Sequence, residues 1–258
     1  MEFEGHQVEE GTGLRVVDTH AHLEEVVDLD LEIQKAKKAG VVAMIAVGTN
    51  TKANKIALDV SEKFRDYVFP AVGIHPWDTS NCSEEDVKFI RDNAGRCVAI
   101  GEVGLDFWIK QDQKAQATVF EKMLTLAKTE RKPALVHSRG AWKDCFEAVS
   151  RLEVEKAVFH WYSGPLDVLE KILESGYYVS SSPAVEYSKH HREAIEKVPI
   201  ERLLLETDSP VSYKGVKSTP SDVMKTLKYV SKLKGMDEPE VAEVTTRNAA
   251  KLFGLKLP

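Results

Sequence analysis

Short apolar runs alternate with amphipathic stretches along almost all of this 258-residue chain, and this alternation limits the folds that it can adopt. Most of the runs are apolar at nearly every position, which is typical of strands buried on both faces of a parallel sheet. The runs that we expect to form strands are residues 16–22, 41–48, 68–75, 98–105, 133–138, 156–161, 177–182 and 202–208.

Helical patterns occupy the segments between these runs. Gly40 follows one apolar stripe and is a residue type that often ends helices. Ser83 precedes three acids, which predicts an N-cap with a favourably charged first turn. The longest helical pattern covers residues 113–132, and two more, 221–234 and 239–253, follow one another at the end of the chain.

A strand followed by a helix, repeated eight times without a break in composition, predicts a single (β/α)8 barrel, or TIM barrel, over residues 1–258. Residues 221–258 would then supply C-terminal helices that close the barrel, and residues 1–13 an N-terminal extension. The alternative is a doubly wound sheet with its ligand crevice at one switch point. Polar residues follow many of the predicted strands, which favours the barrel.

Composition narrows the class of protein further. No apolar run approaches the roughly 18 residues of a membrane-spanning helix, and the first fifteen residues are acidic and lack the apolar core of a secretory signal. Cys82, Cys97 and Cys145 are scattered and odd in number, which fits a reducing cytoplasm. The net charge of −6 argues against broad wrapping of nucleic acid but permits nucleic acid chemistry at a small site where metal ions supply positive charge.

Histidines and carboxylates gather at the ends of the predicted strands. Parallel barrel strands open their carboxyl ends on one mouth, so these side chains should meet. His20 and His22 are two residues apart on one strand and therefore point to the same side. The other residues in this position are His75, Glu102, His137, His160 and Asp208. The remaining histidines, His6, His190 and His191, lie outside the strands and are expected at the surface.

So many imidazoles and carboxylates at one mouth predict a metal centre. Any one of them alone is better explained as a hydrogen-bonded core residue, but unpaired burial of all of them would cost several kcal/mol each. Coordination of neutral imidazole and ionised carboxylate removes that cost. The set is large enough for two divalent ions, with Glu102 central and able to bridge them. The proposed ligands are His20, His22, Glu102, His137, His160 and Asp208.

Aromatic and cationic residues follow the same strand ends. Arg139 stands beside His137 and could hold a phosphate or a carboxylate, or else form a salt bridge with an acid of the chain. Lys214 and Lys217 are further candidates for contact with an anionic substrate. The tryptophans could stack planar ligands such as nucleobases or simply pack the loops together; they are Trp77, Trp108, Trp142 and Trp161.

The order of these motifs resembles that of the TatD family of metal-dependent hydrolases, within the amidohydrolase-type barrels. Nucleophile-elbow, phosphate-loop and dinucleotide-binding motifs are absent from the sequence. The matching segments span roughly residues 16 to 254 and are DTHAHL (18–23), GIHPW (73–77), GEVGLD (101–106), HSR (137–139), HWYSG (160–164), LLLETDSP (203–210) and TTRNAAKLFG (245–254).

The resemblance implies a hydrolase of phosphodiesters that uses two divalent ions, Mg²⁺, Zn²⁺ or Mn²⁺. It implies that His20 and His22 bind one ion with Asp208, that Glu102 bridges, and that His137 and His160 bind the second. His75 would contact the scissile phosphate, with help from Arg139. The sequence departs from the family in the loop HWYSG, where the usual motif is HCFSG, and in the loop after Asp208.

From this we expect a cytoplasmic deoxyribonuclease, a monomer with 3′-exonuclease activity as in several family members. In the expected mechanism Asp208 helps to deprotonate a water that attacks phosphorus, Glu102 and the imidazoles hold the ions, and His75 stabilises the added charge while Arg139 orients the substrate. One alternative is a metal-dependent ester or amide hydrolase, such as a D-aminoacyl-tRNA deacylase. A non-catalytic nucleotide-binding protein is a third possibility, to which the complete ligand set lends least support.

Overall fold

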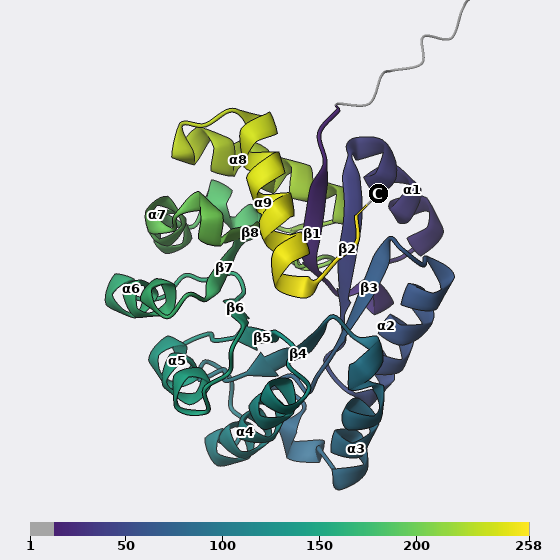
Figure 1. The fold of residues 1–258 in the computed structure, drawn as a ribbon, viewed down its shortest axis with the longest axis vertical. Coiled ribbons are helices and arrows are strands. Elements are labelled where there is room, and N and C mark those ends of the chain that lie inside the picture. The colour runs from purple at the N-terminus through teal and green to yellow at the C-terminus, as the bar shows by residue number, and fades with distance from the viewer. Residues whose placement is uncertain (1–12, 258) are drawn as a thin grey trace, which may run out of the picture.

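A computed structural model describes residues 13–257 and has eight parallel strands around a nearly closed barrel (Figure 1). Each strand pairs with the next along the chain, so the expected (β/α)8 architecture is confirmed. The strands are β1 (Val16–Ala21), β2 (Val41–Val47), β3 (Val68–Val72), β4 (Ala99–Gly104), β5 (Ala134–His137), β6 (Ala157–Phe159), β7 (Tyr178–Ser181) and β8 (Leu203–Leu205). A small antiparallel hairpin of β9 (Ser212–Tyr213) and β10 (Val216–Lys217) follows.

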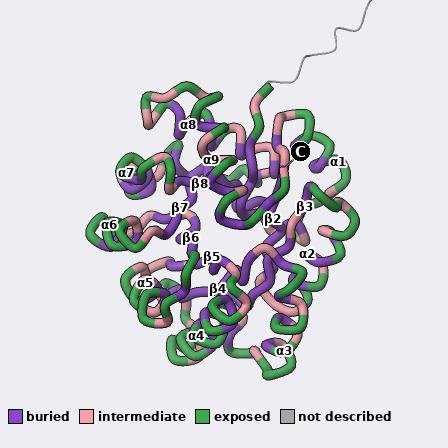
Figure 2. The backbone as a smooth tube through the Cα atoms, in the orientation of Figure 1, coloured by how far each residue is buried: buried purple, intermediate pink, exposed green. Residues whose placement is uncertain are grey.

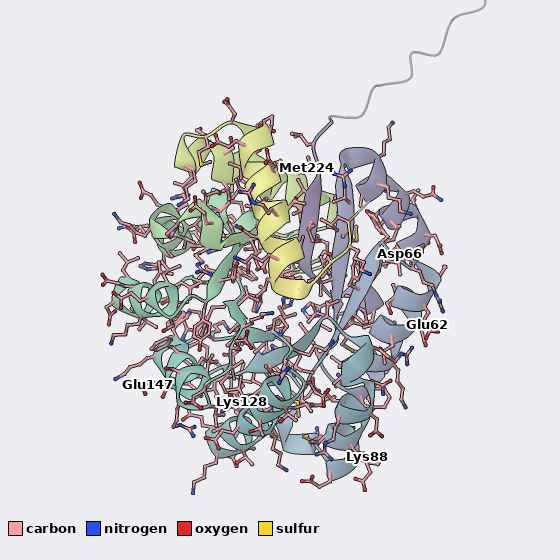
Figure 3. All side chains as sticks on the ribbon, in the orientation of Figure 1. Glu62, Asp66, Lys88, Lys128, Glu147 and Met224 are labelled. Carbon is pink, nitrogen blue, oxygen red and sulfur yellow. The ribbon has the colours of Figure 1, made fainter. Side chains whose placement is uncertain are left out.

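The helices surround the sheet, and their outer faces are exposed to solvent (Figures 1 and 2). Glu62, Lys88 and Glu147 are examples that project outward (Figure 3). The helices are α1 (Leu29–Ala39), α2 (Thr51–Lys63), α3 (Glu84–Asn93), α4 (Gln113–Thr129), α5 (Trp142–Arg151), α6 (Leu166–Glu174), α7 (Lys189–Lys197), α8 (Val223–Lys234) and α9 (Glu238–Phe253).

The predicted helix ends agree with the local geometry. Ser83 caps α3 in a capping box with Asp86, in which each side chain bonds to the backbone of the other. Gly40 follows α1 with φ of 102°, a conformation that only glycine adopts freely. These caps set the points at which the chain turns from helix back to strand.

Alternating strand residues divide the core into two layers. One set, including Met44, Val72 and Ile100, packs outward against the helices. The other set, including Ile45 and Leu204, fills the barrel interior together with the last turn of α9. Burial on both sides explains why the strands are apolar at nearly every position.

Helix α9 covers the amino end of the barrel. Thr246 donates a hydrogen bond to the carbonyl of Arg15, and the Asn248 amide donates to the carbonyl of Leu203 at 2.9 Å. Leu252 and Phe253 join the interior cluster. Because this end is closed, the opposite, carboxyl end is left as the mouth.

The sheet closes between β1 and the segment that directly follows β8. The Asp18 carboxylate accepts hydrogen bonds from the backbone N–H of Thr207 at 2.9 Å and from its hydroxyl at 2.6 Å. The N–H of Asp208 donates to the carbonyl of His20 at 2.8 Å. This seam places the first and last strands of the barrel side by side.

Among residues 13–257, no helix combines the length and the hydropathy needed to span a bilayer. The N-terminal extension expected at residues 1–13 lies, apart from Gly13, outside the described residues.

Candidate active site

The carboxyl ends of the strands surround a cavity of about 1050 Å³. His20, Glu102 and His137 lie on strands, and the other proposed ligands, His75 and Arg139 come within three residues of a strand end. His20 is fully buried within this group. The structure therefore brings the proposed metal ligands together with His75 and Arg139, and those that line the cavity are His22, His75, Glu102, His137, Arg139, His160 and Asp208.

Glu102 lies between two groups of imidazoles. Its Oε1 is 2.7 Å from Nδ1 of His137 and 2.8 Å from Nε2 of His160. Its Oε2 is 3.3 Å from Nε2 of His20 and 3.4 Å from Nε2 of His22. The two oxygens of one carboxylate thus face different pairs of nitrogen atoms, which is the arrangement that a bridging ligand requires.

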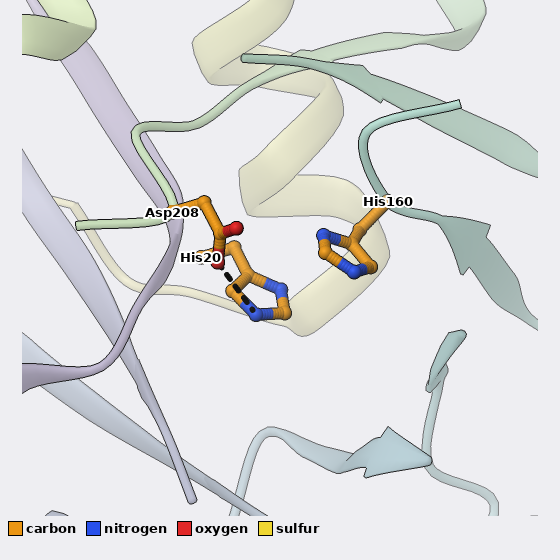
Figure 4. A group of neighbouring side chains, drawn as sticks. All are labelled: His20, His160 and Asp208. Atoms are coloured by element: carbon orange, nitrogen blue, oxygen red, sulfur yellow. Dashed lines mark ion pairs between the residues drawn. The ribbon is translucent and has the colours of Figure 1, made fainter. Parts of the chain in front are cut away.

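Asp208 completes the first of these pairs. Its Oδ1 lies 3.3 Å from Nε2 of His22. The same oxygen lies 3.6 Å from Nε2 of His20 (Figure 4). Within the described residues, Oδ1 of Asp208 and Nε2 of His20 are buried and have no hydrogen-bond partner. Buried polar atoms without partners are costly, and a shared cation would satisfy both of these atoms. This part of the site therefore fits a metal ion.

Hydrogen bonds on the outer ring nitrogens make two of these imidazoles suitable ligands. Nδ1 of His22 lies 3.0 Å from the carbonyl of Val47, which can only accept, so Nδ1 carries the proton and Nε2 has a free lone pair. Nε2 of His137 lies 3.2 Å from a carboxylate oxygen of Asp106, which leaves Nδ1 free on the inner side. Partners of this kind orient metal-binding histidines in general.

His75 has the opposite arrangement. The backbone N–H of Trp77 donates to its Nδ1 at 3.2 Å, so the neutral ring carries its proton on Nε2. That nitrogen lies 3.4 Å from Glu102, and burial lowers the pKa of His75. Although His75 forms a compact group with Glu102 and His137, it presents an N–H donor to the cavity and no lone pair.

Charge coupling keeps both carboxyl groups ionised. Burial opposes ionisation of Glu102, but imidazoles including His75 and His160 hold its pKa well below the usual value. For Asp208, burial is likewise outweighed by the neighbouring imidazoles, His22 first among them, and its pKa falls to about 2. Burial alone would lower the pKa of His22, but Asp208 and Glu102 raise it well above the usual value. Protons and cations therefore compete for the same nitrogens.

Asp106 belongs to the site but was not singled out from the sequence. Its Oδ2 contacts Nε2 of His137, Nε of Arg139 at 2.9 Å and Nε1 of Trp77 at 2.8 Å. The side-chain amide of Gln116 holds the Asp106 backbone through two hydrogen bonds. Arg139 thus forms the salt bridge that the sequence left open and also lines the cavity. The one indication in the sequence was an acid directly beyond an apolar strand.

Glu206 is a second acid missed from the sequence. It is fully buried, with Oε1 3.5 Å from Nδ1 of His160. The same carboxylate accepts hydrogen bonds from the Ser180 hydroxyl at 2.6 Å and from the backbone N–H of Trp161 at 2.9 Å. It therefore faces the outer side of the His160 ring, as Asp106 does for His137.

All four tryptophans line the cavity, whereas Lys214 and Lys217 do not. Trp161 also packs against Tyr213, with ring centroids 5.2 Å apart. Lys214 lies 3.4 Å from Glu186, to which its charge is paired. The structure gives no support for the predicted contact of these lysines with substrate.

The prediction for His191 was wrong. It is fully buried, with Nδ1 2.7 Å from the carbonyl of Tyr162 and Nε2 accepting from the N–H of Ser182 at 3.2 Å. The amphipathic pattern of α7 did not reveal which of two adjacent histidines faces inward. His190 is exposed as expected, and His6 lies outside the described residues.

Comparison with protein families settles the relationship. The family model for TatD-related DNases matches residues 17–254. The chain belongs to the TatD family. The uncharacterized metal-dependent hydrolase YabD of Bacillus subtilis is 33% identical over 250 residues, which cover 92% of this TatD-family chain and 98% of YabD. The human deoxyribonuclease TATDN3 is 32% identical over 261 residues, covering 93% of this chain and 95% of TATDN3.

A solved structure of the TatD family agrees with the fold. The crystal structure of YjjV, a TatD homologue from Escherichia coli K12, superposes with a TM-score of 0.88 at 25% identity. The alignment covers 94% of this chain and 99% of YjjV. The TatD relationship therefore extends over the barrel and the loops that carry the site.

Proposed function

We propose that this TatD-family metal-dependent hydrolase cleaves phosphodiester bonds in DNA with two divalent cations. The names of its relatives support this: the human one is called a deoxyribonuclease and the bacterial one a metal-dependent hydrolase. The observation that carries the proposal is the position of Glu102, whose two oxygens face different pairs of imidazoles. Two-cation centres of this kind are common among enzymes that cleave phosphodiesters.

The donor atoms divide into two sets. His20, His22 and Asp208 would hold one cation, because their nitrogen and oxygen atoms converge. His137 and His160 would hold the other, and Glu102 lies between the two sets. These residues all come from one chain, so the proposal requires no partner subunit. The free thiols of the described residues fit a cytoplasmic protein.

When bound, the cations lower the pKa of water and offset the negative charge that develops on the phosphate. Asp208 would accept the proton of the attacking water with its carboxylate, which is ionised at neutral pH. His75 donates its Nε2 proton in a hydrogen bond to a phosphate oxygen. Arg139 orients the substrate at the rim through the guanidinium donors that Asp106 leaves free.

Metal removal tests the proposal directly. The purified protein is treated with a chelator and then given Mg²⁺, Mn²⁺ or Zn²⁺ singly. Four imidazole ligands favour Zn²⁺ or Mn²⁺ over Mg²⁺. We expect hydrolysis of a 5′-labelled oligonucleotide to fall at least about a hundredfold in chelator and to return with one of these ions. Stepwise shortening of the 5′-labelled strand would identify a 3′-exonuclease.

Two controls sharpen this experiment. Glu102→Ala removes the bridging carboxylate and should remain inactive with every ion, while its circular dichroism matches the wild type. Unchanged cleavage in chelator, or wild-type rates in Glu102→Ala, would refute the two-cation mechanism. Cleavage of aminoacyl-tRNA esters without cleavage of DNA would be compatible with the two-cation centre but would refute DNA as the substrate.

A further inference from the structure

The loops after β4 and β5 are joined beyond the ends of their strands. The N–H of Leu105 donates to the carbonyl of His137 at 3.1 Å, and the N–H of Phe107 donates to that of Arg139 at 3.0 Å. Asp106 lies between these two bonds and is fully buried. The backbone therefore places its carboxylate between a proposed metal ligand and the rim arginine.

A single oxygen of Asp106 accepts from three side chains. Oδ2 lies 3.2 Å from Nε2 of His137 and 2.8 Å from Nε1 of Trp77. It also lies 2.9 Å from Nε and 2.7 Å from Nη2 of Arg139. The other oxygen, Oδ1, accepts from the backbone N–H of Trp108 at 3.0 Å. Asp106 thus contacts both a proposed metal ligand, His137, and the arginine at the rim of the cavity.

Arg139 depends on this contact for its position. Its side chain is 40% exposed, and an exposed arginine samples many rotamers. The guanidinium lies 5.5 Å from the ring centre of Trp77 and 5.7 Å from that of Trp108, distances that permit cation–π attraction. Of its five N–H donors, Asp106 takes one from Nε and one from Nη2, so about three remain for an anion.

We propose that Asp106 is a positioning residue that fixes the ring of His137 and the guanidinium of Arg139 relative to each other. Through His137 it orients a nitrogen toward the metal centre, and through Arg139 it presents donors to the substrate phosphate. The part of this inference that concerns Arg139 and the substrate phosphate rests on the proposed function. It assigns to Asp106 no contact with the substrate or with a cation.

Asp106→Asn tests the half that concerns His137. The amide of asparagine is the same size as the carboxylate of Asp106. If its N–H₂ group faces the surrounding donors, it repels them; if its oxygen faces them, that oxygen is a weaker acceptor than a carboxylate. Titration of metal-free protein with Mn²⁺, followed by electron paramagnetic resonance, should show the affinity for one ion reduced about 10- to 100-fold. Asp59→Asn, an exposed change on α2 with the same loss of charge, is the matched control and should bind Mn²⁺ as the wild type does.

A double-mutant cycle tests the half that concerns Arg139. Alone, Arg139→Gln should raise KM for an oligonucleotide about tenfold, as the loss of a charged hydrogen-bonding group does. In the Asp106→Asn background the same change should raise KM less than about threefold, because the arginine is no longer held. A merely structural role of Asp106 would lower the melting temperature and leave the two KM effects multiplicative.

The outcomes separate this inference from the proposed function. Absence of metal-dependent cleavage by the wild type would overturn the proposed function, while the Mn²⁺ titration still tests Asp106. An active wild type with unchanged Mn²⁺ affinity in Asp106→Asn and with multiplicative KM effects would overturn this inference alone. If Asp106→Asn does not fold, Asp106→Ala replaces it, since water can then fill the vacated space, and the same results are expected.

Discussion

At the residue scale, the hydrogen bond on the outer ring nitrogen of three imidazoles decides what the inner nitrogen can do. The carbonyl of Val47 and the carboxylate of Asp106 accept hydrogen bonds from the outer nitrogens of His22 and His137, so lone pairs face the cavity. The backbone N–H of Trp77 donates a hydrogen bond to the outer nitrogen of His75, so an N–H faces the cavity. One residue type can therefore offer a metal-binding lone pair and a hydrogen-bond donor within the same cluster.

This difference predicts the behaviour of His75→Ala. The variant should still bind two ions per chain, because His75 offers no lone pair to a cation. Its kcat should fall about a hundredfold or more, the usual effect of losing a donor to developing charge. Elemental analysis and steady-state kinetics on the same preparation would check both points. Loss of one ion would identify His75 as a ligand.

His191 gives a prediction for the pH dependence of stability. Burial lowers its pKa to about 4, so the folded protein keeps the ring neutral while the unfolded chain takes up a proton below about pH 6.5. The stability contributed by His191 is therefore present above pH 6.5 and is lost as the pH falls toward 4. This loss is about 2 kcal/mol between pH 7 and pH 5.

The measurement compares urea unfolding of metal-free wild type and His191→Gln at both pH values. The variant should be less stable at pH 7, and the gap should narrow by about 2 kcal/mol at pH 5. His190→Gln is the matched control, since the adjacent ring is exposed. A gap that does not change with pH would mean that folding does not lower the pKa of His191.

At the scale of elements, the sequence predicted each barrel strand but placed several ends too late. The run at residues 68–75 ends as a strand at Val72, because the Asn54 side chain bonds both the N–H and the carbonyl of Gly73, at 3.1 and 2.8 Å. His75 thus stands on a clamped loop. Apolar periodicity shows where a strand is buried, but it does not show which partner takes the backbone bonds beyond it.

The acids that support the histidines were hidden for a related reason. Asp106 and Glu206 read as ordinary polar residues at strand ends, and their roles depend on loops 31 to 46 residues away. The gathering of the proposed ligands could be predicted, since six residues of three types, His, Glu and Asp, recur at the ends of the strands. An acid that contacts a histidine of another strand–helix repeat shows no such pattern in the sequence.

Gly104→Ala tests the close approach of β4 and β5. Gly104 has φ of 151°, and a Cβ there would lie 1.9 Å from the carbonyl oxygen of His137. The strands must separate, and we expect the free energy of unfolding to fall by about 3 kcal/mol. Gly95→Ala is the control, because a Cβ there meets nothing within 4 Å, and urea unfolding should show little change. If the Gly104→Ala and Gly95→Ala variants were equally stable, a Cβ at position 104 would not force β4 and β5 apart.

At the scale of the whole molecule, the two ends of the barrel differ in structure and in the residues that they carry. The amino end is sealed by α9 and by the interior cluster, whereas the carboxyl end is open and carries the ionisable residues. Stability and chemistry are therefore separable by position in this fold. The mouth can hold unpaired polar atoms because apolar packing elsewhere maintains the barrel.

Phe253→Ala tests this separation. Phe253 is 6% exposed and packs into the interior cluster, so its removal should lower the free energy of unfolding by about 3–5 kcal/mol. Lys251→Ala, an exposed change on the same helix, should alter it by less than about 0.5 kcal/mol. Mn²⁺ affinity, measured well below the melting temperature, should stay at the wild-type value in both variants. Weaker binding in Phe253→Ala would show that the two ends are coupled.

The seam between β8 and β1 joins segments from opposite ends of the polypeptide, since Asp18 and Thr207 are 189 positions apart. During synthesis, a ribosome-bound chain exposes His20 and His22 long before Asp208 has been made. All three residues proposed to hold the first cation would come together only after β8 had emerged and docked against β1. Products terminated before Asp208 would therefore lack part of the proposed metal centre.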